Sequence, residues 1–92
     1  MFVVVAYDIA SDRRRNKVAK ILAGYGERVN LSVFECEFKK PETLVALKGK
    51  LKEVIKPKKD HIRYYTICME CRAKIAIQGY GAVEEKQVVK FA

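Results

Sequence analysis

Chemically active side chains gather at the end of the first apolar run of the sequence. Residues 2–7 (FVVVAY) are β-branched or aromatic with little interruption, which predicts a strand covered on both faces. The run ends at Asp8, and an arginine cluster follows at 13–15. A carboxylate at the mouth of a buried strand is costly unless a cation, a metal or a hydrogen-bond donor compensates it. This combination indicates a site that binds an anionic substrate with the help of a divalent metal ion.

Asp8 is the candidate catalytic and metal-binding residue. A carboxylate is a hard oxygen ligand suited to Mg²⁺ or Mn²⁺, and magnesium takes one or two protein carboxylates together with waters and substrate phosphate. One aspartate per chain is a sparse ligand set. A two-fold dimer could bring two copies of Asp8 to one ion, which would activate a water against a phosphodiester. The alternative is a structural Asp8, paired with Arg15 or Arg28 or accepting hydrogen bonds from loop amides.

The candidate nucleic-acid contacts are basic side chains in and after the first helix. Arginine suits bidentate phosphate contacts, whereas lysine serves as a point charge. Three positive charges at the N-terminus of a helix oppose its macrodipole and so do not stabilise the helix. This unfavourable placement suggests that the arginines bind a ligand instead. The alternative is an ordinary solvated helix face. The candidates are Arg13, Arg14, Arg15, Lys17 and Arg28.

Four strand aromatics could stack on nucleic-acid bases, although such residues are more often part of a core. They are Tyr7, Phe34, Tyr64 and Tyr65. His61 is the only histidine, and a lone histidine at a strand edge is more often structural than a general base. These side chains alone therefore do not define a site.

The three cysteines do not form a recognisable metal or redox motif. Cys68 and Cys71 are spaced as CxxC, but with Cys36 they supply three thiols where a tetrahedral zinc site takes four ligands. A thioredoxin-like pair would lie at the start of a helix in a βαβ unit, which this spacing does not predict. Local packing or an optional disulfide is the expectation.

Composition indicates a basic globular chain with a polyanionic partner. Its 92 residues include 19 Lys and Arg against 11 Asp and Glu, a net charge of +8. Such an excess suits nucleic acid first and an anionic membrane surface second, against the alternative of a merely soluble basic protein. The length predicts one domain over 1–92, small enough that a dimer is expected to bury more surface. No secretory signal or membrane span is recognisable, which predicts a cytoplasmic location and no membrane partner.

Hydrophobic periodicity predicts two helices among the strands. An apolar stripe that includes Val18 and Leu22 predicts a first helix, with Ser11 or Asp12 as its cap and glycines at 24 and 26 as its stop. Pro41 fits the first turn of a second helix, which a further proline at 57 ends.

The remaining segments predict strands. Residues 27–38 alternate, with a change of phase near Ser32 that indicates a bulge or a tight turn between two strands. Residues 61–68 predict a strand, 68–71 a short turn, 74–78 a short strand, and 87–91 a strand that pairs with a sheet edge, either its own or that of a second copy. The order is that of an α+β, ferredoxin-like βαββαβ fold with an additional C-terminal strand: an antiparallel sheet with helices on one face.

Several short stretches, in this order, resemble the CRISPR-associated protein 2 family. They are Tyr7-Asp8, the arginines at 13–15, and the segments 25–29 (YGERV), 32–35 (SVFE) and 61–65 (HIRYY). The resemblance covers nearly the whole chain. It implies a ferredoxin-like homodimer in which each C-terminal segment, about 79–92, pairs onto the sheet of the other subunit.

The resemblance also implies a function in CRISPR spacer acquisition. There, the dimer bridges integrase dimers of CRISPR-associated protein 1 and lies along the captured DNA duplex. Some family members are described as metal-dependent endonucleases acting on single-stranded RNA or double-stranded DNA, with the aspartate at the Asp8 position holding the ion. The arginines of the family correspond to Arg15 and Arg28, its serine to Ser32 and its phenylalanine to Phe34. Lys17 stands at a position where the family frequently has an arginine. A lysine keeps the positive charge there but lacks the planar guanidinium that makes a bidentate phosphate contact.

The sequence is compatible with three functions. The first is a metal-dependent endonuclease that uses Asp8 with Mg²⁺ or Mn²⁺. The second is a non-catalytic DNA-binding subunit in which Asp8 is structural. The third is a toxin-like ribonuclease of the same fold. The excess of positive charge supports binding more directly than catalysis, because the ligand set is sparse.

Overall fold

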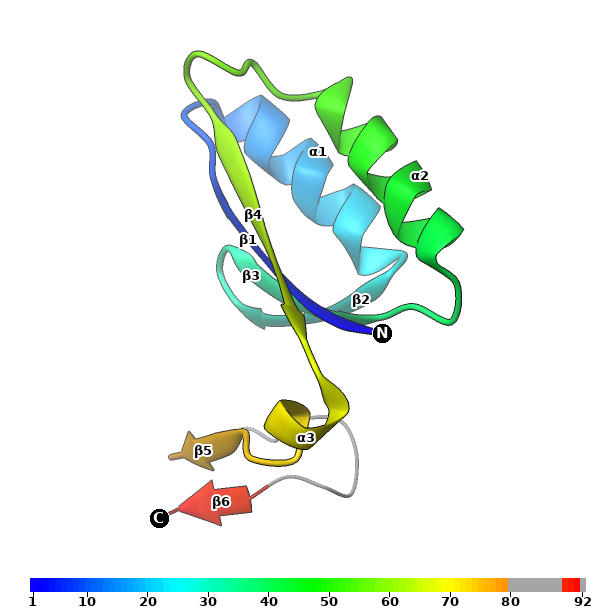
Figure 1. Ribbon diagram of the computed structural model, residues 1–92. Coiled ribbons are helices and arrows are strands. Elements are labelled where there is room, and N and C mark those ends of the chain that lie inside the picture. Colours follow the sequence, from blue (N-terminus) through cyan, green and yellow to red (C-terminus); the bar gives the residue numbers. More distant parts are fainter. Residues whose placement is uncertain (80–88, 92) are drawn as a thin grey trace.

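The computed structural model describes residues 1–79 and 89–91, and its main body is one sheet with two helices against it (Figure 1). Its elements are β1 (Phe2–Asp8), α1 (Asp12–Ala23), β2 (Gly26–Asn30), β3 (Val33–Glu37), α2 (Pro41–Lys52) and β4 (His61–Ile67), followed by α3 (Met69–Arg72), β5 (Ala76–Gln78) and β6 (Val89–Phe91).

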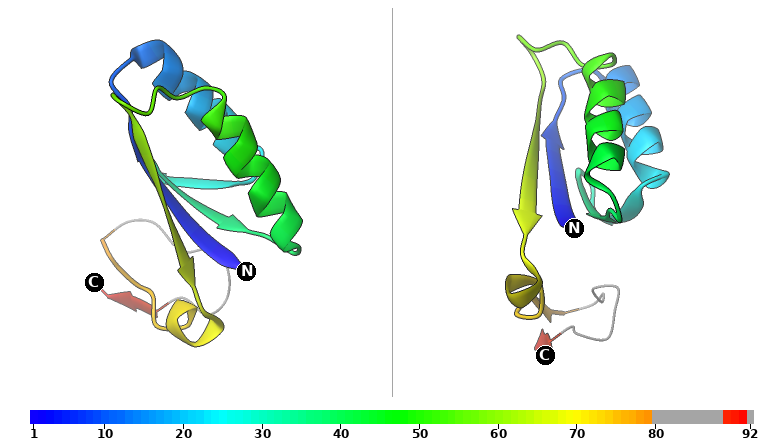
Figure 2. Two further views of the ribbon diagram at one scale, coloured as in Figure 1. Left: turned by 45° about the horizontal axis from the view of Figure 1, so that its top comes forward. Right: turned by 45° about the vertical axis from the view of Figure 1, so that its right-hand side comes forward.

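The four-stranded sheet has the order β2-β3-β1-β4, and each neighbouring pair is antiparallel. Both α1 and α2 lie on the same side of this sheet, and the other side carries no helix of comparable length in the described ranges (Figure 2). The predicted α+β, ferredoxin-like arrangement is therefore confirmed. None of the helices in these ranges is long and apolar enough to cross a membrane.

The two helices form where the sequence provides a start signal and one apolar face. Ser11 caps α1, because its Oγ accepts a hydrogen bond from the backbone N–H of Arg14 at 3.2 Å. Val18 and Leu22 on the inner face of α1 are completely buried. Pro41 begins α2, and the leucines at 44, 47 and 51 bury its inner face. Apolar burial against the sheet then holds both helices in place.

The two faces of β1 differ more than its apolar sequence predicts. Val3, Val5 and Tyr7 point toward the helices and are at most 5% exposed. The alternate residues Val4 and Ala6 are only partly buried, and Asp8 is exposed. The prediction of a strand covered on both faces is therefore confirmed only in part: Phe2, on the same face as Val4, is 5% exposed, but α1 and α2 both lie on the opposite side of the sheet and leave the rest of this face uncovered. We refer below to the side without α1 and α2 as the open face.

The predicted change of phase near Ser32 is confirmed, and it has two components. β2 and β3 are joined by a tight turn at Leu31 and Ser32, and the register between the strands shifts between Arg28 and Asn30. The turn is tied to β1, since the backbone N–H of Tyr7 donates to the carbonyl oxygen of Ser32 at 3.0 Å. The hairpin is thereby fixed beside the strand that ends at Asp8.

The segment after β4 departs from the predictions in one respect. The sequence predicts a short turn at 68–71, but the chain forms the one-turn helix α3, because Cys68 is able to cap it: its Sγ accepts a hydrogen bond from the backbone N–H of Cys71 at 3.4 Å. Arg72 fastens α3 to the sheet, with its guanidinium 4.2 Å from the ring centre of Phe2 and paired with Glu37. The predicted strand at 74–78 is confirmed in part as β5.

β6 pairs in parallel with β5 of the same chain. The predicted C-terminal segment, about 79–92, lies largely outside the described residues, because 80–88 and 92 do not belong to them. Its pairing with a second subunit stays a prediction.

Candidate functional site

Asp8 lies at the end of β1 with its side chain on the open face. It is exposed, and it is in register with His61, the first residue of β4. Directly opposed residues of antiparallel strands project from the same face of a sheet, so the carboxylate and the imidazole are neighbours. The sequence alone gives His61 no role, because only the strand register reveals this proximity.

The structural alternative for Asp8 is not observed among the described residues. Its carboxylate has no ion pair or hydrogen bond within them. Arg15 instead donates to the carbonyl oxygen of Ile9 at 3.0 Å and pairs with Asp12. Arg28 donates to the carbonyl oxygen of Leu31. Asp8 therefore presents an uncompensated charge on the open face, as a ligand for a cation must.

Arg14 has a structural partner that lies 46 residues away in the sequence. Its Nε and Nη2 donate to the two carboxylate oxygens of Asp60 at 2.7 and 3.1 Å. The Asp60 side chain is fully buried and also accepts hydrogen bonds from the backbone N–H groups of Ala10 and Lys56. The Arg14 hydrogen bond is the main cause that holds the pKa of Asp60 far below its usual range. Asp60 thus joins the loop after β1 to the loop before β4, and Arg14 ties α1 to the same point.

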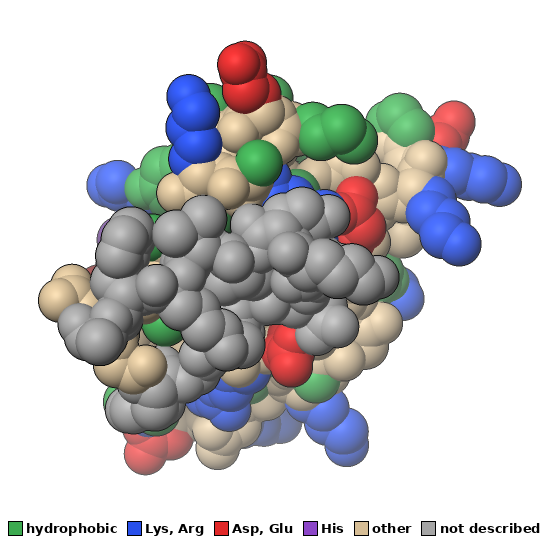
Figure 3. Space-filling view, turned by 90° about the horizontal axis from the view of Figure 1, so that it is seen from below, with side chains coloured by type: hydrophobic (Ala, Val, Ile, Leu, Met, Phe, Trp, Pro, Cys, Tyr) green, Lys and Arg blue, Asp and Glu red, His purple; other side chains and the backbone are tan. Residues whose placement is uncertain are grey.

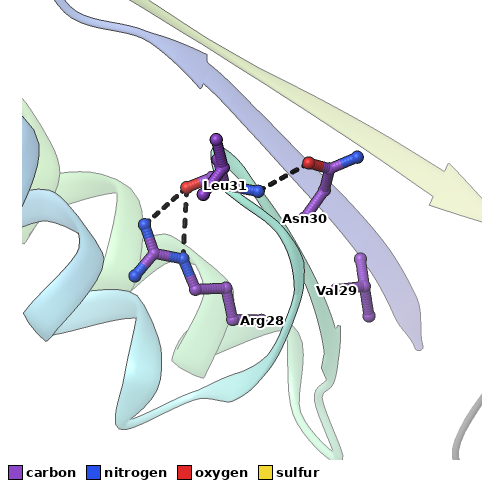
Figure 4. Close-up of a pocket in the computed structure, with 4 residues that line it drawn as sticks. All are labelled: Arg28, Val29, Asn30 and Leu31. Atoms are coloured by element: carbon purple, nitrogen blue, oxygen red, sulfur yellow. Dashed lines mark hydrogen bonds between the residues drawn. The ribbon is translucent and has the colours of Figure 1, made fainter. Parts of the chain in front are cut away.

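Arg28 turns back on its own hairpin. Its Nε and Nη2 donate to the carbonyl oxygen of Leu31 at 3.1 and 2.6 Å, while Asn30 Oδ1 accepts from the Leu31 N–H (Figure 4). Its guanidinium also lies 5.7 Å from the ring centre of Phe34. Residues 28–31 line an open hollow of about 450 Å³. Arg28 remains exposed, so its other N–H groups can reach an external phosphate.

Three cations on α1 form an exposed stripe, which we call the α1 stripe: Arg13, Lys17 and Lys20. They are spaced at i, i+4 and i+7, which places them on one side of the helix. No hydrogen bond or ion pair within the described part of the chain engages them. The sequence predicts Arg13 and Lys17 as nucleic-acid contacts, but not Lys20. Lys20 becomes a candidate only in the structure, which shows that Arg14 and Arg15 are engaged elsewhere and that Lys20 lies on the same side of α1 as Arg13 and Lys17.

Positive charge is concentrated on the helical side of the molecule. The segments 12–23 and 39–60, which comprise both helices and their adjoining loops, hold thirteen Lys and Arg and four Asp and Glu. Their net charge of +9 exceeds the +8 of the whole chain, so all remaining residues together are nearly neutral. At the end that carries α3, basic and acidic side chains are interspersed around the rim (Figure 3).

The open face carries acids beside its partly apolar strip. Glu27 and Glu35 are in register on β2 and β3, an unfavourable arrangement for two like charges. Burial raises the pKa of Glu35, and the negative charge of Glu27 raises it further. On β4, Arg63 donates to the hydroxyl oxygen of Tyr65 at 3.3 Å. This face is therefore poorly suited to a polyanion unless a metal ion intervenes.

Asp8 is the candidate ligand for a divalent metal ion. The described residues contain no group of three or more His, Cys, Asp and Glu placed to hold an ion. Asp8 nevertheless matches the ligand preference of Mg²⁺ or Mn²⁺, which bind one or two carboxylates and retain several waters. A second copy of Asp8 would complete such a set. The donor chemistry therefore fits a shared ion between two chains rather than an ion held by one.

The motif aromatics Tyr7 and Phe34 are core residues. They are 5% and 1% exposed, and their ring centres lie 6.4 Å apart. Tyr7 also donates its hydroxyl hydrogen to the carbonyl oxygen of Leu31 at 3.2 Å. The structural reading is confirmed for both, since a ring at this depth cannot stack on a base. Tyr64 is partly buried, and the Nζ of Lys48 lies 4.9 Å from its ring centre, whereas Tyr65 is 48% exposed.

Comparisons with known proteins agree with this architecture. The family model for the CRISPR associated protein Cas2 matches residues 1–75. A relative from Chloroflexus aurantiacus, CRISPR-associated endoribonuclease Cas2 1, is 45% identical over 86 residues, which cover 92% of this chain and 91% of the relative.

Two solved structures are also similar. Streptococcus pyogenes Cas2 superposes with a TM-score of 0.74 at 35% identity, over 82% of this chain and 95% of that one. A chain of a partial Cas6-RT-Cas1–Cas2 complex gives a TM-score of 0.69 at 32% identity, over 76% of each chain. The family model, the identity and the shared fold lead to one conclusion: this chain belongs to the CRISPR-associated Cas2 family.

Proposed function

We propose that this chain acts in CRISPR spacer acquisition, where it binds nucleic acid and bridges subunits of the integrase Cas1. The observation that carries the proposal is the concentration of positive charge on the helical side, where the α1 stripe has no internal partners among the described residues. Neutralising phosphates with such cations releases counterions and favours binding without sequence preference. Similarity to a chain from a Cas1–Cas2 complex supports the partnership with Cas1.

The proposal includes a homodimer formed through the open face. Val4 and Ala6 are only partly buried there, and the outer edge of β4 is unpaired within the described strands. A second copy on this face would cover the apolar strip and bring two Asp8 side chains together. It would leave the helical side of both subunits accessible to a duplex.

Replacing the α1 stripe by alanine (Arg13→Ala, Lys17→Ala and Lys20→Ala together) should weaken binding to a short DNA duplex. The slope of log affinity against log salt concentration should fall by about 0.9 for each phosphate that the variant no longer neutralises, thus by up to about 2.7. Fluorescence anisotropy over a series of salt concentrations measures both effects. The fold should persist, because the three side chains are exposed.

Lys74→Ala is the matched control, since it removes a single exposed charge outside the helical side. It should leave the salt slope nearly unchanged. The three substitutions of the α1 stripe are also made one at a time for this comparison. If Lys74→Ala weakened DNA binding as much as each of them, total charge rather than its placement would determine the affinity. Unchanged DNA binding by the triple variant would overturn the proposed interface.

A second candidate function is metal-dependent hydrolysis of a phosphodiester. The observation that favours it is the exposed carboxylate of Asp8, unpaired within the described residues, on the face proposed to meet a second copy. Asp8 from each subunit would hold Mg²⁺ or Mn²⁺, which supplies an activated water and neutralises developing negative charge. His61, beside Asp8, is placed to orient such a water or to exchange a proton with it.

Asp8→Asn should lower metal-dependent cleavage of RNA or DNA by about 100-fold or more, because the charge that holds the ion is removed. DNA binding and the midpoint of thermal unfolding should stay close to those of the unmodified chain, since Asp8 is exposed. Cleavage of single-stranded RNA and of duplex DNA is measured in Mg²⁺ and in Mn²⁺. A wild-type chain that cleaves neither substrate in either metal would refute the hydrolytic function and leave the binding function standing.

A further inference from the structure

Two thiols lie side by side where the chain leaves the sheet. Cys68 immediately precedes α3 and Cys71 lies within it, and both are free and exposed. The third cysteine, Cys36, is completely buried on β3. The exposed pair takes no part in the function proposed above, and the buried thiol provides a natural reference for it.

The geometry of α3 brings the two sulfur atoms within reach of each other. The Sγ of Cys68 folds over the helical turn and lies 3.4 Å from the backbone nitrogen of Cys71. Helical residues at i and i+3 have Cα atoms about 5 Å apart. This separation lies within the range of about 4.4–6.8 Å that disulfides span. A bond between the two sulfurs therefore needs side-chain rotation and no rearrangement of the backbone.

Cys68 also forms part of the wall of a small hollow. The hollow has a volume of about 190 Å³, and its other lining residues include Thr66, Met69 and Arg72. Met69 is 87% exposed, so the hollow opens to solvent beside the thiol. Glu37 also lines the hollow, and it pairs with both Arg72 and the ammonium of Met1, so two positive charges face one negative charge there. This local excess of positive charge favours an approaching molecule that carries carboxylates. A small disulfide bearing carboxylates fits this environment.

We propose that Cys68 and Cys71 form a redox-active dithiol that exchanges with small-molecule disulfides of the oxidised glutathione class. Cys68 is the attacking thiol, and Cys71 resolves the intermediate. The hydrogen bond from the Cys71 backbone N–H, followed by that from the Cys71 thiol, lowers the pKa of Cys68. The same thiol contact raises the pKa of Cys71, and burial raises the pKa of Cys36 to about 11. Only Cys68 thus gains thiolate character.

The exchange balances as two successive displacements. The Cys68 thiolate attacks one sulfur of oxidised glutathione, whose S–S bond breaks, and one glutathione thiolate leaves. Cys71 then loses its proton and attacks the Cys68 sulfur of the mixed disulfide, which releases the second glutathione. In sum, two protein thiols are oxidised to one disulfide and one small disulfide is reduced to two thiols. The product is a disulfide between Cys68 and Cys71, which closes a ring of residues 68–71 between β4 and β5.

Intact-mass measurement after incubation with oxidised glutathione tests the proposal on the full chain. The wild-type chain should lose two hydrogen atoms and retain no glutathione, and dithiothreitol should reverse the change. Cys71→Ser should accumulate one glutathione on Cys68, because the resolving thiol is absent. Cys68→Ser should react at least several-fold more slowly. Peptide mapping should find Cys36 reduced in every case.

Three outcomes would overturn the assignment. Stable glutathione adducts on the wild-type chain would show that Cys71 does not resolve the intermediate. Equal rates for Cys68→Ser and Cys71→Ser would show that Cys68 is not the preferred nucleophile. A chain that stays fully reduced at excess oxidised glutathione would show that the pair is only structural. Both serine variants are expected to fold, since the two side chains are exposed, and circular dichroism checks this.

Discussion

Replacing Asp60 by alanine is expected to lower the midpoint of thermal unfolding by on the order of 10 °C or more. The substitution leaves the Arg14 guanidinium and the N–H groups of Ala10 and Lys56 without their acceptor. Because the Asp60 side chain is fully buried, water cannot replace it without rearrangement. Differential scanning calorimetry at neutral pH measures the shift.

Asp12→Ala is the matched control, since it removes an aspartate that also pairs with an arginine of α1 but has a side chain 85% exposed. Exposed pairs contribute little, and a shift of at most a few degrees is expected. If both variants unfolded at the same temperature, the buried pair would not be the element that joins the two loops.

The same ion pair predicts the direction of the acid response. The pKa of Asp60 is lowered in the folded chain from its ordinary value of 3.8, mainly by the Arg14 hydrogen bond. Its contribution is therefore complete above the unfolded pKa and is lost as pH falls below it toward the folded value. The difference in thermal midpoint between the wild-type chain and Asp60→Asn should shrink as pH falls below 3.8. A difference that is constant with pH would exclude this linkage.

Gly26→Ala is expected to destabilise the chain by about 1–3 kcal/mol or more, because β2 leaves no room for a side chain there. A Cβ atom at this position would lie 2.5 Å from the Sγ of Cys36 and 2.8 Å from its Cα, with the carbonyl oxygen of Glu35 also too close. Since part of this obstruction is backbone of β3, the strands would have to separate. Urea denaturation followed by circular dichroism measures the change in the free energy of unfolding.

Gly49→Ala provides the opposite control within the same chain. A Cβ at Gly49 meets nothing within 4 Å, and the residue lies inside α2. Replacing an exposed helical glycine by alanine should therefore stabilise the chain by about 0.5–1 kcal/mol. Two glycine-to-alanine changes of opposite sign would show that local space decides the result. A tolerated Gly26→Ala would instead mean that β2 adjusts freely.

Much of the fold could be predicted because its signals are local. The apolar stripe through Val18 and Leu22, the Ser11 cap and the proline at the start of α2 each act within a few residues, and the structure confirms all three. The helix α3 could not be predicted in this way. Four residues are too few for a periodic pattern, and its cap is a cysteine rather than one of the usual capping residues.

The candidate site could be predicted only in part, because its geometry depends on contacts distant in sequence. Asp8 is recognisable from its place at the end of an apolar run, yet its neighbour His61 becomes apparent only from the register of β1 with β4. Arg14 and Lys17 look equivalent in the sequence. Asp60, which engages the first and leaves the second free, lies more than 40 residues away, so no local pattern distinguishes them.

The unequal distribution of charge between the two sides of the sheet gives the molecule a large electric dipole moment. With +9 on the helical segments and nearly no net charge elsewhere, this dipole points from the strands toward α1 and α2. The field of an extended polyanion exerts a torque on such a molecule at distances up to about the Debye length. On the proposed function, the chain would therefore approach a nucleic acid with its helices foremost, and that contact would leave the open face accessible to a second subunit.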